Sequence, residues 1–126
     1  MYYNGNYSPE GVDVSASLFS PDRIYTVDKN HHKISVSVID FNKWFRESNI
    51  SRCDVLKLDC EGAEYDIVYS IPDGYFSRIR YIVADVHKMS NENENIHALS
   101  AYLERKGYSV NTVNDEILYA KYTGRP

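Results

Sequence analysis

Three ionisable side chains stand where two apolar segments of the sequence end. Asp59 and Glu61 follow the run 54–58, and His87 follows the run 81–86. A carboxylate beside an imidazole can hold it in one tautomer and raise its basicity, which suits proton transfer near neutral pH. If the two segments are neighbouring parallel strands, their ends meet at one crevice. Asp59, Glu61 and His87 are therefore the candidate catalytic residues.

One of these carboxylates, Glu61, also has a structural interpretation. Glu61 and Glu64 lie where a helix is predicted to begin, and acidic side chains interact favourably with the helix dipole there. Glu61 is therefore either a capping residue or a functional one. Asp59 closes an otherwise apolar segment and gains little in that place unless something binds it, so we favour a functional role for Asp59.

A metal site is a further interpretation of the same residues. Oxygen and imidazole ligands at two strand ends suit a divalent ion, and Asp59, Glu61, Asp85 and His87 would supply them. The protein would then be a small metal-dependent hydrolase. No close HxxxH spacing supports this interpretation, so we predict no metal.

The pattern of apolar residues predicts the strands that would position these side chains. Polar and apolar residues alternate over 33–38, as in a half-buried strand. The run 54–59 predicts a second strand, and the continuous apolar run 81–86 predicts a third that is covered on both faces. Segments 108–113 and 117–122, separated by three turn-prone residues, predict an antiparallel hairpin.

Helices are predicted between these strands. The first begins after Asp40, whose side chain can cap it. The aromatic residues on one face of this helix are expected to pack into the core: Phe41, Trp44 and Phe45. Two more helices are predicted, over 63–69 and from Ile96 to the terminating Gly107. Alternation of strands and helices with short links predicts an α/β fold with a mostly parallel sheet and an antiparallel last strand.

Composition is that of one ordinary globular domain. The 126 residues are 43% hydrophobic and 25% charged, and we predict a single domain over 1–126. Residues 1–32 are predicted to be irregular and 33–122 to form the α/β core. The net charge of -4 argues against nucleic-acid binding, because neutralising phosphates requires clustered Lys and Arg.

The sequence favours a cytoplasmic protein. Cys53 and Cys60 are too few for a disulfide framework and do not form a CxxC pair, which fits a reducing compartment. The polar, turn-rich start MYYNGNYSPEG is unlike a secretion signal, and no apolar run is long enough to span a membrane. No membrane or nucleic-acid partner is therefore predicted.

Several common catalytic signatures do not occur in the sequence. Its six glycines never form GxG, so it has no dinucleotide fingerprint, and GxxxxGK[ST], the phosphate-binding loop, does not occur. GxSxG, the serine nucleophile elbow, does not occur either. Covalent hydrolase mechanisms are therefore disfavoured.

Three segments in order resemble the FkbM-type methyltransferases. VSVIDF over 36–41 is similar to the "LD" segment that precedes a short helix in that family. The segment 54–64, DVLKLDCEGAE, resembles the family's "DLLKIDVEGAE"-like block, and YIVADVH over 81–87 resembles its next strand. The resemblance covers roughly residues 33–121.

The resemblance implies a Rossmann-like class I methyltransferase fold with S-adenosylmethionine as the methyl donor. It further implies transfer to a hydroxyl oxygen, often of a sugar, glycan or other natural product. Asp59 and Glu61 would lie near the transferred methyl group or the acceptor, with His87 across the crevice as a candidate base. Asp40 stands roughly where related folds place an acidic residue on the adenine side, and helix capping explains it as well.

Family members also carry an upstream glycine-rich turn and an acidic ribose ligand, and this chain is expected to begin after both. We therefore expect a half-domain that is truncated at its N-terminus and binds the cofactor weakly or not at all by itself. The missing strands would leave the segment 54–58 as an exposed apolar edge. The alternative is a non-catalytic binding or assembly module that pairs with another chain through this edge.

Overall fold

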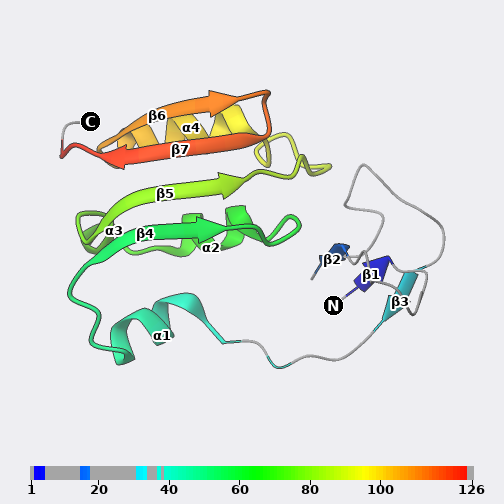
Figure 1. Ribbon diagram of the computed structural model, residues 1–126, viewed down its shortest axis with the longest axis horizontal. Helices are drawn as coiled ribbons and strands as arrows, with labels where there is room; N and C mark the ends of the chain where they lie inside the picture. The colour runs from blue at the N-terminus through cyan, green and yellow to red at the C-terminus, as the bar shows by residue number, and fades with distance from the viewer. Residues whose placement is uncertain (1, 5–14, 18–30, 34–36, 38, 125–126) are drawn as a thin grey trace.

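A computed structural model describes residues 2–4, 15–17, 31–33, 37 and 39–124 of the chain (Figure 1). Its centre is a four-stranded sheet in the order β4-β5-β7-β6. The strands are β4 (Cys53–Leu58), β5 (Ile79–Asp85), β6 (Tyr108–Val113) and β7 (Ile117–Tyr122). This sheet and its helices form an α/β structure, as predicted.

Strand directions follow from two kinds of connection, a helical crossover and a hairpin turn. A helical crossover joins β4 to β5, and these two strands pair in parallel with Leu58 opposite Ala84. β7 pairs antiparallel with both β5 and β6, so β4, β5 and β6 all run in one direction. The predicted parallel neighbours and the predicted antiparallel last strand are both confirmed, and the sheet is mixed.

Two helices cover one face of the sheet, α2 (Glu64–Ser70) and α4 (Ile96–Arg105), as Figure 1 shows. Successive side chains of a strand point to opposite faces. Five buried strand residues alternate onto the helical side: Leu58, Ile82, Ala84, Leu118 and Ala120. Ile79, the first residue of β5, is also buried but lies three positions before Ile82 and so does not share this alternation. They form one hydrophobic core with the apolar faces of the helices, and the short helix α3 (Asp73–Phe76) adds Phe76 to it.

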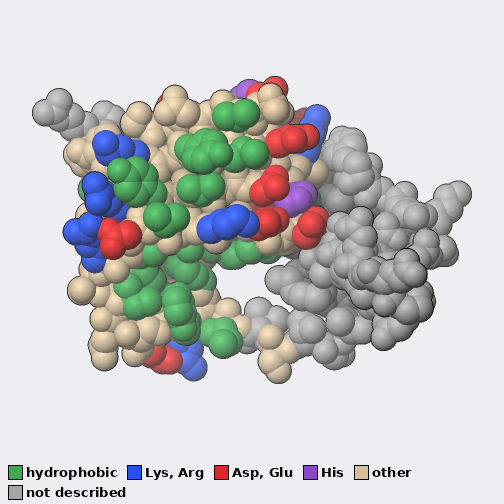
Figure 2. All heavy atoms as spheres, in the orientation of Figure 1, with side chains coloured by type: hydrophobic (Ala, Val, Ile, Leu, Met, Phe, Trp, Pro, Cys, Tyr) green, Lys and Arg blue, Asp and Glu red, His purple; other side chains and the backbone are tan. Residues whose placement is uncertain are grey.

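The opposite face of the sheet has no helical cover among the described residues. Val55 of β4 is 58% exposed and Tyr119 of β7 is 45% exposed, while Tyr81 and Val83 of β5 are half-buried. Figure 2 shows hydrophobic side chains at the surface of this face. The prediction that 81–86 is covered on both faces is therefore wrong for the described part of the chain, because an apolar run alone cannot show which face is packed.

The first helix, α1 (Phe41–Glu47), begins as predicted. The side chain of Asp40 accepts a hydrogen bond from the backbone N–H of Lys43 at 2.6 Å, which satisfies one of the unpaired donors of the first turn. Phe45 is buried, as expected for a core residue. Trp44 is 45% exposed, so its assignment to the core is wrong.

The C-terminal half of the fold follows the predicted order. Asn95 caps α4 by accepting a hydrogen bond from the Ala98 N–H at 3.0 Å, and Gly107 follows the helix with a φ of 91°. Asn114 and Asp115 have positive φ in the turn between β6 and β7. Such turns match the right-handed twist of an antiparallel hairpin, so the predicted hairpin is confirmed.

Three further short strands lie in the segment predicted to be irregular. They are β1 (Tyr2–Asn4), β2 (Ser15–Ser17) and β3 (His31–Lys33), which form an antiparallel sheet in the order β2-β1-β3. The strand predicted over 33–38 falls mostly on residues outside the described ranges and stays a prediction. Among the helices of the described ranges, none has the length and apolar character needed to cross a membrane.

Candidate functional site

The parallel pairing of β4 and β5 brings the three predicted catalytic residues together. Asp59 directly follows β4, and His87 lies two residues after the end of β5. One ligand atom each of Asp59, Glu61 and His87 lies within 4.8 Å of the other two. The three residues therefore lie close together, as the sequence predicted, while the crevice that they would face and their chemical roles stay predictions.

The imidazole of His87 lies between two carboxylates. Its Nε2 atom is 3.3 Å from Oε2 of Glu61, and its Nδ1 atom is 3.3 Å from Oε1 of Glu64. The backbone carbonyl of His87 accepts a hydrogen bond from the Tyr65 hydroxyl at 2.9 Å. The histidine is thus held on both sides of its ring and at its backbone.

Sequence reasoning did not identify Glu64 as part of the site. Its side chain is fully buried, and its two oxygens accept hydrogen bonds from the N–H groups of Cys60 at 2.6 Å and Gly62 at 2.9 Å. A glutamate in the first turn of a helix is common, so its type and position predicted only a favourable dipole interaction. Glu61 is not a cap either, because the N-cap of α2 is Ala63, which makes no side-chain cap bond.

Surrounding carboxylates change the protonation of His87. The hydrogen bond to Glu64 raises the pKa of His87 to about 9, and the charges of Glu64, Glu61 and Asp85 add to the rise against the opposing effect of burial. With such a pKa, only about 1% of the imidazole is neutral at pH 7. His87 is therefore an imidazolium at neutral pH and becomes a base only as the pH approaches 9 or when a nearby cation lowers its pKa.

Asp59 forms an ion pair with Lys57, which lies two residues earlier in β4. Lys57 donates a hydrogen bond from Nζ to Oδ2 of Asp59 at 2.8 Å, and this bond lowers the pKa of Asp59. Asp59 is exposed and stays ionised at neutral pH. Asp85, the fourth residue of the metal-site interpretation, is not in the Asp59, Glu61 and His87 group. The other three residues do lie close enough together to hold an ion, so the absence of a metal stays a prediction.

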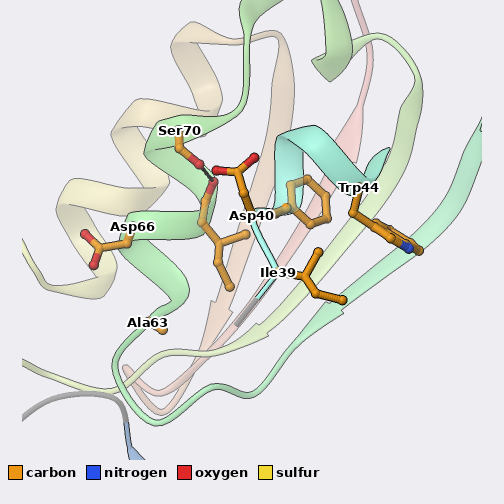
Figure 3. A pocket seen from close by; sticks show the side chains of 8 residues that line it. Ile39, Asp40, Trp44, Ala63, Asp66 and Ser70 are labelled. Carbon is orange, nitrogen blue, oxygen red and sulfur yellow. Dashed lines mark hydrogen bonds between the residues drawn. The ribbon is translucent and has the colours of Figure 1, made fainter. Parts of the chain in front are cut away.

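A cavity of about 510 Å³ opens beside the turn that carries Glu61 (Figure 3). One wall comes from α1 and the residues before it, including Ile39, Asp40 and Trp44, and the other from α2, including Ala63 and Asp66. Ala63 directly follows the 60–62 turn, but Asp59, Glu61 and His87 are not among the residues that line the cavity. Mostly apolar walls with carboxylates at the rim suit a flat apolar ligand that carries donor groups.

Charge is separated along the sheet. Figure 2 shows Asp, Glu and His side chains gathered at the carboxyl ends of β4 and β5, and Lys and Arg side chains at the opposite end. Arg52, Arg78 and Arg80 line a hollow at the amino ends. Because carboxylates predominate at the carboxyl ends of β4 and β5, this end of the sheet favours a positively charged ligand.

In open α/β sheets, ligands bind outside the carboxyl ends of the parallel strands, which is where these acidic residues and the histidine lie. The chain belongs to the methyltransferase FkbM domain family, which matches residues 1–110. The match reaches further toward the N-terminus than the resemblance over 33–121, and it confirms the predicted family.

Similar proteins include two named methyltransferases. One is the 31-O-demethyl-FK506 methyltransferase FkbM of Streptomyces tacrolimicus, 28% identical over 114 residues that cover 90% of this chain and 40% of the relative. The other is Methyltransferase 1 of Beauveria bassiana, 26% identical over 109 residues that cover 76% of this chain and 43% of the relative.

A third relative is the AMB antimetabolite synthetase AmbE of Pseudomonas aeruginosa, 32% identical over 87 residues that cover 64% of this chain and 4% of the relative. The chain therefore spans less than half the length of each of these proteins. No solved structure matches the chain.

Proposed function

We propose that this chain contributes the acceptor side of an S-adenosylmethionine-dependent O-methyltransferase with a Rossmann-like class I fold. The observation that carries the proposal is the convergence of Asp59, Glu61 and His87 at the ends of two parallel strands, in a chain of the FkbM family. The antiparallel last strand and the helices between strands support the proposed fold. The acceptor we propose is a hydroxyl group of a sugar or natural product, because the name of the Streptomyces relative refers to a demethylated oxygen.

The residues present fit such a cofactor. S-adenosylmethionine carries its methyl group on a positively charged sulfur, and the carboxylates of Asp59 and Glu61 give the rim the opposite charge. The cavity beside Ala63 has apolar walls for a flat ring, and Asp40 at its edge is the proposed adenine-side residue. The cap of α1 uses Oδ1 of Asp40, so both roles are compatible.

In such a transfer the acceptor oxygen would form a bond to the methyl carbon while the bond from that carbon to sulfur breaks and its electron pair stays on sulfur, so the acceptor hydroxyl must also lose its proton. We assign proton removal to Nε2 of His87 in its neutral form, since this atom lies beside Glu61 and not beside the buried Glu64. A positively charged donor bound at this end of the sheet would lower the pKa of His87 from about 9 and so favour the neutral form. Glu61 then stabilises the imidazolium that results.

Titration of the isotopically labelled chain with S-adenosylmethionine, followed by NMR, tests this function. Because the glycines of the sequence never form the GxG motif, we expect millimolar affinity, with the largest amide shifts at residues 39–41 and 59–63. Asp59→Asn should weaken binding about tenfold, equivalent to about 1.4 kcal/mol. Asp54→Asn, which removes an exposed carboxylate at the other end of β4, is the matched control and should leave the affinity unchanged.

Two results of this titration would contradict the proposal. Shifts confined to the arginine-rich end of the sheet would place the ligand away from the candidate catalytic residues. No shift anywhere at millimolar concentration would remove the support for a cofactor site. Micromolar affinity would instead contradict only the expectation of weak binding, and would mean that these residues suffice to hold the cofactor.

A second candidate function is a binding or assembly module that pairs with another chain through β4. This strand lies at one edge of the described four-stranded sheet, and its Val55 is 58% exposed. Exposed strand edges with apolar side chains promote association. Size-exclusion chromatography distinguishes the two functions: a stable dimer that is indifferent to S-adenosylmethionine supports the module, whereas a monomer contradicts self-pairing.

A further inference from the structure

Glu64 is the one charged side chain that the described part of the chain buries completely. Removing a carboxylate from water costs several kcal/mol unless its oxygens are paired and hydrogen-bonded. A glutamate that only improved the helix dipole would do so from the surface, without this cost. The burial of Glu64 therefore requires partners that compensate it.

The first set of partners closes the turn between β4 and α2. Oε1 of Glu64 accepts from the Cys60 N–H and Oε2 accepts from the Gly62 N–H. Between these two amides, Glu61 has a φ of 49°, followed by 102° at Gly62. A left-handed conformation is unfavourable for a residue with a side chain, and it persists where the surroundings enforce it. The carboxylate of Glu64 provides this enforcement and so directs the side chain of Glu61.

The remaining partner is the imidazole. Nδ1 of His87 lies 3.3 Å from Oε1 of Glu64, while Nε2 on the other side of the ring lies 3.3 Å from Glu61. A carboxylate that accepts from Nδ1–H fixes the ring orientation and leaves Nε2 as the basic atom. One buried side chain thus contacts both elements of the rim: the turn with Glu61 and the segment after β5.

We propose that Glu64 is the positioning residue of this site, which holds the 60–62 turn in its left-handed conformation and fixes His87 as the Nδ1–H tautomer with Nε2 toward the rim. The catalytic purpose of this arrangement rests on the proposed function. The arrangement itself concerns only this chain and is tested without cofactor or acceptor.

Other charged groups also act on His87, and the test must separate them. Glu61 lies in the turn, Asp59 at the end of β4 and Asp85 at the end of β5. The nearby cations are Lys57, paired with Asp59, and Lys88, which follows in the chain. The hydrogen bond to Glu64 has the largest effect on the pKa of His87, ahead of the charge of Glu61.

Titration of His87 by NMR in three variants tests the proposal. Glu64→Gln keeps the shape but removes the charge, so the pKa of His87 should fall from about 9 toward its ordinary 6.5. Glu61→Gln should produce a smaller fall, because Glu61 acts only through its charge. Asp66→Asn, an exposed position on the same helix, is the matched control and should leave the pKa unchanged. An unchanged pKa in folded Glu64→Gln would overturn the proposal.

The wild-type chain provides a second measurement that needs no substitution. Nitrogen chemical shifts of His87 above pH 10 report which ring atom keeps its proton. We expect Nδ1–H, and observation of Nε2–H would overturn the positioning role even if Glu64→Gln did not fold. Neither result depends on cofactor binding, so a failure of this proposal is distinguishable from a failure of the proposed function.

Discussion

Replacing Leu58 with alanine is expected to lower the free energy of unfolding by about 2 to 5 kcal/mol. Leu58 is the last residue of β4, only 3% of it is exposed, and it packs into the core beneath the helices. Truncation removes apolar contacts and leaves a cavity that the surrounding side chains fill only in part. Because Asp59 follows directly, the same substitution should broaden the NMR signals of Asp59, Glu61 and His87.

The matched control for this substitution lies three residues earlier on the same strand. Val55 is 58% exposed and points to the uncovered face, so Val55→Ala should cost less than about 1 kcal/mol. Urea unfolding of both variants measures the difference. Equal losses of several kcal/mol would contradict the one-sided sheet, and would show that a second chain or another segment buries Val55.

Sequence patterns predicted the elements that local chemistry determines. Asp40 is a good cap wherever a helix begins, and Gly107 ends α4 because glycine tolerates its φ of 91°. The parallel pairing of β4 with β5 followed from the helix between them. From that pairing alone, the convergence of Asp59 and His87 could be predicted without any knowledge of the family.

The features that the sequence did not predict depend on contacts between distant residues. Tyr81 and Val83 are as apolar as the buried Ile82, so composition could not show that one face of β5 lacks cover. Trp44 has the spacing of a core residue, but it stands at the mouth of a cavity. Both errors arise because periodicity identifies a face of an element and not the neighbour that packs against it.

Glu64 illustrates the same limit at the site itself. Its position in the first helical turn has a sufficient local explanation, so nothing in the sequence required a second one. Only the fold shows that His87, 23 residues further along the chain, meets the same carboxylate. Whether a charged side chain can be buried depends on the groups that pair with it. For Glu64, the pairing of β4 with β5 shows which groups these are.

The second large effect concerns stability at alkaline pH. The pKa of His87 is about 9 in the folded chain and near its ordinary 6.5 in the unfolded chain, so the folded state binds the proton more tightly. This difference stabilises the fold by on the order of 3 kcal/mol below pH 6.5, where both states are protonated. The contribution then declines and is lost as the pH rises through 9. Unfolding by urea at pH 6, 7.5, 9 and 10 should follow this decline.

His87→Gln separates this effect from other alkaline titrations. Burial raises the pKa values of Cys53, Cys60, Tyr65 and Tyr108, so their ionisation in the unfolded chain also lowers stability at high pH. These groups are present in both proteins, and their effects cancel when the two unfolding curves are subtracted. The wild type should therefore lose about 3 kcal/mol more than His87→Gln between pH 6 and 10. Parallel losses in the two proteins would mean that the imidazole does not hold its proton between Glu61 and Glu64, because a histidine titrating near 6.5 in both states contributes no such difference.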